Sequence, residues 1–264
     1  MSKVLLFDCD GVLGDTEQHG HLPAFNQMWR ELGVPWKWSV EEYGRKLKIG
    51  GGKERMSSLF GEPEFRSVYD PPAGEQERKD LIALWHKRKS AIYKEIVNSG
   101  RIPPRPGVRR LAEEALAAGW ILGVASTSAQ ESVEAVLRRA MGEETAGRFA
   151  LVLAGDVVNA KKPAPDIYLL AAERLGAPPA SCVVVEDSNN GLIAAATAGM
   201  KCVVTVSGYT REEDFSQADI VLSCLGDPDG EPAVVIENRS AARPGGCFTV
   251  AHLEAVLSGG GYAA

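Results

Sequence analysis

The chain has 264 residues, a formal net charge of −6 and 24% charged residues, so it can bury a full core beside a smaller domain and shows neither a nucleic-acid patch nor an acidic disordered tail. Its five cysteines are odd in number and never form a C-x-x-C pair, which favours reduced, buried thiols over a disulfide framework or a zinc site. No apolar stretch approaches membrane-spanning length, and we expect no signal or transit peptide because the first strand begins at once.

That first strand ends in two acids. Residues 4–7 are apolar, as in a buried strand, and Asp8, Asp10 and Gly11 follow directly. Because successive side chains of a strand alternate, the two carboxylates should point the same way. Burying such a pair costs free energy unless a cation accompanies it, and oxygen-rich pairs suit Mg2+. An ordinary strand followed by an Asp/Gly turn explains the same four positions without any chemistry.

The next segment, residues 17–100, shows helical patterns and no convincing strand. The predicted helices cover residues 17–32, 40–48, 52–60 and 75–98. We expect the tryptophans of this segment to fill a core; they are Trp29, Trp36, Trp38 and Trp85. Residues 63–74 read as a helix-breaking loop and 101–107 as a stiff, proline-rich connector.

From residue 105 onward, apolar runs alternate with helical patterns. The predicted strands are residues 120–125, 149–154, 182–185, 202–206 and 220–222, and the helices are 107–118, 129–141, 165–175 and 190–198. Strands without polar alternation, separated by helices, indicate a parallel sheet covered on both faces. We therefore predict a doubly wound, Rossmann-like α/β core, formed by residues 1–15 and 105–264, with a helical cap and its connector at 16–104. Residues 227–264 should form loops and a frayed tail.

Polar side chains follow several of these strands at the edge where such folds bind ligands. Ser126 follows the second strand and could cap the next helix or contact phosphate. Lys161 and Lys162 follow the third strand in a proline-stiffened turn, where one of them could serve as a fixed cation. Glu186 and Asp187 end the fourth strand, although one acid could cap the following helix. The carboxyl ends of the strands converge on one crevice in such a sheet. Independent helix-capping roles therefore do not explain why acids, a hydroxyl and lysines all follow these strands.

In order and spacing, four of these segments resemble the motifs of the haloacid dehalogenase superfamily; they are Asp8-x-Asp10-Gly, Ser126, Lys162-Pro and Glu186-Asp187. The resemblance implies a phosphatase or phosphomutase with a cap inserted after the first motif. By this resemblance Asp8 is the nucleophile that forms an aspartyl-phosphate, and Asp10 is the general acid and base. The implied phosphate-binding residues are Asp8, Gly11, Ser126, Thr127 and Lys162. The implied Mg2+ ligands are Asp8, Asp10 through its backbone carbonyl, Glu186 and Asp187.

Substrate choice should lie in the cap. Three consecutive glycines, Gly50 to Gly52, precede Lys53 and Arg55 and read either as an anion-cradling loop or as a flexible linker. A second phosphate site in the cap would complement the one expected in the core. Near the start of the cap stands Glu17, followed by two histidines that are candidates to face the substrate; His21 is preferred over His19.

Longer stretches resemble the CbbY-type sugar-bisphosphate phosphatases of plants and algae; they are residues 7–13, 15–17, 48–56 and 161–165. The resemblance implies hydrolysis of xylulose-1,5-bisphosphate, an inhibitor of Rubisco, to xylulose 5-phosphate. It implies substrate-binding cap residues at Glu17, His21, Gly51, Gly52, Lys53 and Arg55. It also implies the chloroplast stroma as the location, or the cytoplasm if the source is not photosynthetic.

Two other functions share these motifs. A phosphomutase similar to β-phosphoglucomutase would return the phosphoryl group to a sugar instead of to water. A catalytically silent sugar-phosphate sensor could use the same fold, because a fold alone does not fix a function. In each case the expected partner is a small phosphorylated sugar, with no nucleic acid and no membrane, and the expected assembly is a monomer.

Overall fold

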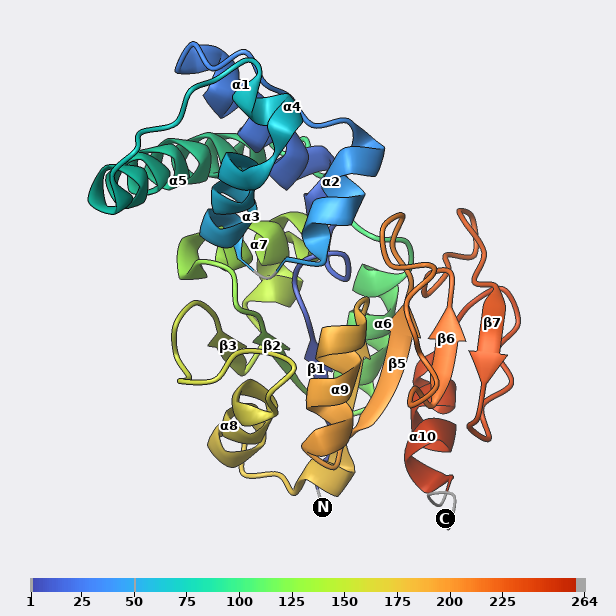
Figure 1. The fold of residues 1–264 in the computed structure, drawn as a ribbon. Coiled ribbons are helices and arrows are strands. Elements are labelled where there is room, and N and C mark those ends of the chain that lie inside the picture. Colours follow the sequence, from blue (N-terminus) through green and yellow to red (C-terminus); the bar gives the residue numbers. More distant parts are fainter. Residues whose placement is uncertain (1, 50, 260–264) are drawn as a thin grey trace. The chain divides into compact units, whose positions relative to one another are not determined.

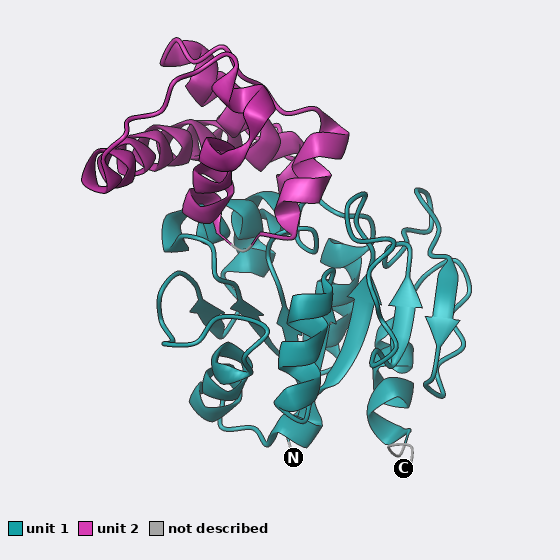
Figure 2. Cartoon of the chain, viewed as in Figure 1, with its two compact units in different colours: residues 1–15, 103–264 teal, residues 16–102 magenta. Residues whose placement is uncertain are grey.

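The computed structural model describes residues 2–49 and 51–259, which fall into two compact units (Figure 2). One unit, the core, comprises Met1–Asp15 and Pro103–Ala264, and the other, the helical unit, comprises Thr16–Ile102. Gly50, the first glycine of the predicted anion-cradling loop, lies outside the described residues, as do residues 260–264 of the predicted tail.

Within the described residues of the core, seven strands form one sheet in the order β3-β2-β1-β4-β5-β6-β7 (Figure 1). The strands are β1 (Val4–Phe7), β2 (Ile121–Ala125), β3 (Leu151–Leu153), β4 (Cys182–Glu186), β5 (Lys201–Thr205), β6 (Ile220–Leu222) and β7 (Val235–Asn238). All neighbours are parallel except β6 and β7. The predicted Rossmann-like α/β class is therefore confirmed, with an antiparallel edge strand that the sequence had not indicated.

The register of the central strands positions the first acid. Phe7 pairs with Val124 of β2 on one side and with Val185 of β4 on the other. The next residue, Asp8, donates its backbone N–H to the carbonyl oxygen of Val185 at 3.0 Å. Asp8 therefore leaves the sheet level with the end of β4, where Glu186 stands.

Helices cover both faces of this sheet (Figure 1). They are α6 (Val108–Ala117), α7 (Gln130–Ala146), α8 (Asp166–Arg174), α9 (Asn189–Thr197) and α10 (Val250–Ser258). Helices α6, α7 and α10 pack together on one face, and α8 and α9 pack together on the other. Buried alanines on α8 and α9 allow these helices to approach the valine-rich strands closely.

The helical unit has an aromatic core. Its elements are a π-helix (Glu17–His21), α1 (Leu22–Glu31), α2 (Val40–Leu47), α3 (Gly52–Ser58), a 3-10 helix (Leu59–Gly61), α4 (Pro63–Arg66) and α5 (Glu75–Asn98). Trp29, Trp38 and Trp85 are buried, and Trp36 packs edge-on against Phe65 at 5.2 Å between ring centroids. Trp29, Trp38 and Trp85 therefore fill a core, as predicted, whereas Trp36 is half-buried.

Two predictions about loops were wrong. Residues 63–74 are not all loop, because α4 begins at Pro63, and proline is well suited to a helix start. The segment from residue 227 is not a frayed tail, because it contains β7 and α10. Helix α10 begins with a capping box at Thr249 and buries Leu253 and Val256. In the sequence, β7 and α10 are short apolar stretches flanked by glycine and proline, and such flanks are typical of loops.

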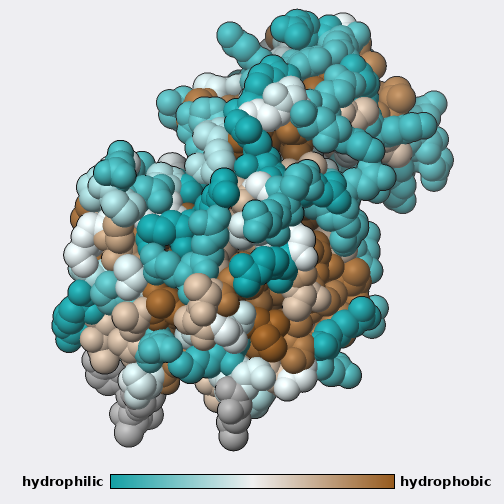
Figure 3. Space-filling view, turned by 180° about the vertical axis from the view of Figure 1, so that it is seen from behind, coloured by the Kyte–Doolittle hydropathy of each residue, from teal (hydrophilic) through white to brown (hydrophobic). Residues whose placement is uncertain are grey.

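The surface and the cysteines agree with the composition. Hydrophilic residues cover most of the helical unit, while apolar patches lie on the core in the view from behind (Figure 3). None of the described helices combines the length and apolar character needed to cross a membrane. All five cysteines are free, and Cys9, Cys182, Cys202 and Cys224 are buried, as the odd number indicated.

Candidate active site

Lys162 joins two buried carboxylates of the core, those of Asp8 and Glu186. Its Nζ atom donates to Asp8 Oδ1 at 2.6 Å, to Glu186 Oε1 at 2.7 Å and to the carbonyl oxygen of Ala125 at 3.0 Å. An ammonium group has three N–H donors, so these three acceptors use all of them. The structure therefore brings the predicted nucleophile, the predicted cation and the first acid of the fourth strand together.

The Glu186 carboxylate is held on both oxygens. Oε1 accepts hydrogen bonds from Lys162 and from the Tyr168 hydroxyl at 2.6 Å. Oε2 accepts from the backbone N–H of Asp187 at 3.1 Å and from the Ser188 hydroxyl at 3.3 Å. A Cβ atom on Gly191 would lie 1.9 Å from this carboxylate, so only glycine leaves room for it there. Ser188, not an acid, is the N-cap of α9.

Asp187 lies against the turn that follows β1. Gly11 in that turn has a φ of +76°, and a Cβ atom on it would stand 2.0 Å from Asp187 Oδ2. A side chain at position 11 would therefore be strained in its backbone and would collide with the acid. One oxygen each of Asp8, Glu186 and Asp187 lie within 4.8 Å of one another.

Asp10 is held by a residue that sequence reasoning missed. The Ser128 hydroxyl donates to Asp10 Oδ2, and the Ser128 backbone N–H donates to Ser126 Oγ at 3.2 Å. Ser126 is buried and Thr127 is exposed. Helix α7 has Ala129 as its N-cap and no side-chain cap, so Ser126 does not cap it. Ser128 stands directly after the predicted Ser-Thr pair, and this adjacency was the available signal.

Burial and charge perturb the cluster strongly. Burial raises the pKa of Asp8; Lys162 opposes the rise, Glu186 and Asp10 add to it, and the pKa reaches about 7. For Lys162, burial alone would lower the pKa, but Asp8 and Glu186 raise it well above its ordinary value. Burial and the same two carboxylates raise the pKa of Tyr168, so its hydroxyl stays a proton donor. Lys162 therefore remains charged, and the charges of Glu186 and Asp10 near Asp8 oppose the ionisation that Lys162 favours.

The donor set fits a hard divalent cation. Three carboxylates lie together in a buried site, and Lys162 pairs with two of them, Asp8 and Glu186. Carboxylate and carbonyl oxygens are the ligands that Mg2+ prefers. The side chain of Asp10 is not part of this three-carboxylate group, which leaves its backbone carbonyl as its predicted contribution.

The helical unit gathers several of the predicted cap residues in two groups. In the first, the Tyr43 hydroxyl donates to Glu17, and Arg55 donates to Tyr43 Oη at 3.2 Å. In the second, His21 stacks on Tyr93 with 3.9 Å between ring centroids, and its Nδ1 lies 2.6 Å from the Nζ of buried Lys89.

The remaining cap positions lie elsewhere on the same unit. Gly51 precedes α3 with a φ of +92°, and Gly52 and exposed Lys53 open that helix. His19 is exposed, whereas His21 is half-buried in the second group. Tyr43 and Lys89 were not predicted, and a tyrosine or lysine on an amphipathic helix gives no distinctive sequence signal.

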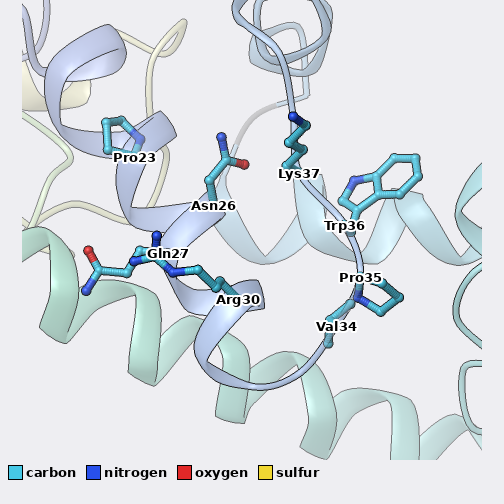
Figure 4. A pocket seen from close by; sticks show the side chains of 8 residues that line it. All are labelled: Pro23, Asn26, Gln27, Arg30, Val34, Pro35, Trp36 and Lys37. Atoms are coloured by element: carbon cyan, nitrogen blue, oxygen red, sulfur yellow. The ribbon is translucent and has the colours of Figure 1, made fainter.

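A separate groove of about 620 Å3 lies in the helical unit (Figure 4). Residues of α1 form one wall and residues 34–37 the other, and Asn26 ties the walls together through two hydrogen bonds of 2.9 Å with the Trp38 backbone. Arg30 and Lys37 are the cations among the described residues that line it. The predicted cap residues do not line this groove.

Comparison with known proteins identifies the family. The family model of the haloacid dehalogenase-like hydrolases matches residues 2–199. The chain belongs to this family. It is 48% identical to the CBBY-like protein of Arabidopsis thaliana over 234 residues, which make up 88% of this chain and 72% of that protein. It is 41% identical to the plasmid-encoded protein CbbY of Cupriavidus necator over 226 residues, 86% of this chain and 87% of that protein.

Solved structures of CbbY support the same assignment. CbbY from Rhodobacter sphaeroides in complex with phosphate matches with a TM-score of 0.73 and 40% identity, covering 85% of this chain and 95% of that one. A variant of the same protein, in complex with xylulose-(1,5)bisphosphate, matches equally well. The chain is therefore a phosphatase of the haloacid dehalogenase-like family, related to CbbY.

Proposed function

We propose that this phosphatase hydrolyses the 1-phosphate of xylulose-1,5-bisphosphate, releasing xylulose 5-phosphate, in a Mg2+-dependent reaction with an aspartyl-phosphate intermediate. The observation that carries the chemistry is the 2.6 Å contact between Lys162 and Asp8 inside a buried acidic cluster. The substrate is supported by the 40% identity to a CbbY protein crystallised with this bisphosphate.

In the first half-reaction, an Asp8 oxygen bonds to phosphorus while the bond from phosphorus to the sugar oxygen breaks. Asp10 gives its proton to the leaving oxygen, which would otherwise depart as an alkoxide. In the second, Asp10 takes a proton from water, whose oxygen attacks phosphorus and frees Asp8 and inorganic phosphate. Ser128 holds the Asp10 carboxylate for both transfers through its hydrogen bond.

The transferring phosphoryl group is anionic and must approach an anionic carboxylate. Lys162 supplies a fixed positive charge at Asp8, and Ser126 supplies a neutral hydroxyl donor. Thr127 completes the proposed phosphate site with its backbone N–H group. Gly11 adds room for the phosphate by its lack of a side chain, because its own N–H donates to the carbonyl oxygen of Gly14 at 2.9 Å.

Asp8, Asp187 and the backbone carbonyl of Asp10 would hold Mg2+, with Glu186 beside them. When bound, the metal would neutralise charge on the phosphoryl oxygens and on the carboxylates around them. Glu186 also anchors Lys162, so it serves the site whether or not it touches the metal.

The helical unit selects the sugar in this proposal. Cationic Lys53 and Arg55, with the backbone of Gly51 and Gly52, bind the phosphate that is not transferred. Glu17 and His21 contact the sugar hydroxyls, and their fixed neighbours support this assignment, because preorganised polar groups discriminate substrates best.

Phosphate release from a panel of phosphorylated sugars tests the proposal. We expect xylulose-1,5-bisphosphate to give the highest kcat/KM, in the presence of Mg2+ and without any added hexose. A mutase would instead require a sugar acceptor and would release little phosphate. A silent sensor would also fail to hydrolyse p-nitrophenyl phosphate, so an inactive protein with intact fold would overturn the enzymatic account.

The biological setting is proposed from the relatives. A CBBY-like protein of a plant is among them. If the source is a plant or alga, the proposed location is the chloroplast stroma, where the enzyme would remove a Rubisco inhibitor. Microscopy of cells that express the protein fused to a fluorescent reporter tests this location. We propose a monomer, and light scattering during size-exclusion chromatography measures the mass.

A further inference from the structure

We infer that Tyr168, on α8, is a positioning residue that sets the place of Lys162 beside Asp8. The inference rests on the proposed function, in which Lys162 faces the transferring phosphoryl group. Tyr168 is fully buried in the core, behind the predicted active-site residues, and none of the recognised motifs contains it.

The Tyr168 hydroxyl determines how Glu186 is oriented. It donates to Glu186 Oε1 at 2.6 Å, the same oxygen that accepts from Lys162 at 2.7 Å. A carboxylate oxygen has two lone pairs, so the two donors saturate it. Without the hydroxyl, one lone pair of a buried charge would lose its partner, and Glu186 would compete more strongly for the lysine.

The Tyr168 ring supports the ammonium group directly. Lys162 Nζ lies 4.8 Å from the centroid of the Tyr168 ring, within cation–π range. The ring therefore faces the ammonium group, while Asp8, Glu186 and the Ala125 carbonyl take its N–H donors. Hydroxyl and ring together keep Lys162 from moving away from Asp8.

These two contributions predict a graded series of variants. Tyr168→Phe keeps the ring and removes the hydroxyl, whereas Tyr168→Leu removes both. We expect kcat to fall about 10-fold in Tyr168→Phe and further in Tyr168→Leu, the range typical of groups that orient a catalytic side chain. KM should change less than kcat, because substrate binding is shared with the helical unit.

Binding of inorganic phosphate, measured by calorimetry, is the readout independent of turnover. Its affinity should fall in the same order, because the phosphate site depends on the place of Lys162. Tyr69→Phe is the matched control, since it removes a tyrosine hydroxyl in the helical unit, where the ring packs on Phe65 and Trp85. Both kcat and phosphate affinity should be unchanged in this control.

A double-mutant cycle with Glu186→Gln decides whether Tyr168 acts through Glu186. If it does, Tyr168→Phe should add little to the loss already caused by Glu186→Gln. Additive losses would overturn the inference. So would a Tyr168→Phe protein whose kcat and phosphate affinity stay within twofold of wild type, even with a lower melting temperature, because that result assigns Tyr168 to packing alone.

Activity should be measured on both p-nitrophenyl phosphate and xylulose-1,5-bisphosphate. A wild-type enzyme that hydrolyses only the first would refute the proposed substrate and leave the Tyr168 series readable. Normal turnover of both substrates by Tyr168→Phe would refute the role of Tyr168 and leave the proposed function intact.

Discussion

The buried carboxylate of Asp8 should destabilise the metal-free protein when it is ionised. Its carboxyl group is buried beside two further carboxylates, and its pKa is raised from 3.8 to about 7. Asn has nearly the shape of a protonated aspartate and carries no charge. We therefore predict that Asp8→Asn stabilises the metal-free protein at neutral and alkaline pH while abolishing turnover.

The size of the effect follows from the pKa. A folded-state pKa above the unfolded value means that the folded protein binds this proton more tightly, so stability is lost as pH rises from 3.8 through about 7. A tenfold change in proton affinity corresponds to about 1.36 kcal/mol, so the rise in the pKa of Asp8 gives a penalty of about 4 kcal/mol above pH 7. At pH 5 the penalty should be about 2 kcal/mol by the same relation.

Thermal unfolding of both proteins in EDTA, at pH 5 and pH 8, measures this difference. Asp8→Asn should melt on the order of 10 °C higher at pH 8 and only a few degrees higher at pH 5. Exposed Asp229→Asn is the control and should show no such dependence. Adding Mg2+ should narrow the gap at pH 8, because the metal stabilises the charged carboxylate. An Asp8→Asn protein no more stable than wild type at pH 8 would refute the reasoning.

Three further substitutions test other contacts. Lys162→Met should lower kcat at least about 100-fold, because it removes the only lysine contact to Asp8, the proposed nucleophile, among the described residues; a rise in KM alone, by steady-state kinetics, would contradict its proposed role. Gly11→Ala should weaken Mg2+ binding at least about 10-fold by calorimetry, because its Cβ would collide with Asp187. Gly119→Ala has a similar positive φ in open space and should leave Mg2+ affinity unchanged, so equal losses in both would mean that backbone strain is the cause. Arg105→Met should lower the free energy of unfolding by about 1–3 kcal/mol in urea, because Arg105 donates to the carbonyl oxygens of Val206, directly after β5, and Ser223, directly after β6; an unchanged midpoint would show that these bonds add nothing.

The parallel core was predictable because its strands are buried on both faces. β4 is an uninterrupted apolar run up to Glu186, and every residue in it is buried. Such runs set the strand ends to within a residue or two, and the ends carry the chemistry. The approach of Asp8, Lys162 and Asp187 follows from this topology, since parallel strands place their carboxyl ends at one edge.

The residues that support the site through their side chains were harder to predict, because they do not belong to a run of buried residues. Tyr168 acts through a hydrogen bond to Glu186 and a ring contact with Lys162, and a tyrosine in a helix carries no pattern of its own. Ser128 bonds Asp10, and its place beside Ser126 and Thr127 was its only signal. The C-terminal elements were missed because β7 is an edge strand with exposed Val235 and Ile236, which breaks the expected burial. Its pairing with β6 is fixed by tertiary contacts and not by local propensity.

Two glycines link the predictable and the unpredictable parts of the site. Gly11 leaves space for the carboxylate of Asp187, and Gly191 leaves space for that of Glu186. Gly191 lies in α9, directly after the strand that Glu186 ends, whereas Gly11 follows β1 and is remote in sequence from Asp187, so the second close approach cannot be read from one segment. The sheet brings the turns to one edge, and the missing side chains then let two acids approach Asp8. Burial is the largest cause of the raised pKa of Asp8, and the charge of Glu186 adds to it, so part of that rise depends on the side chain that position 191 lacks.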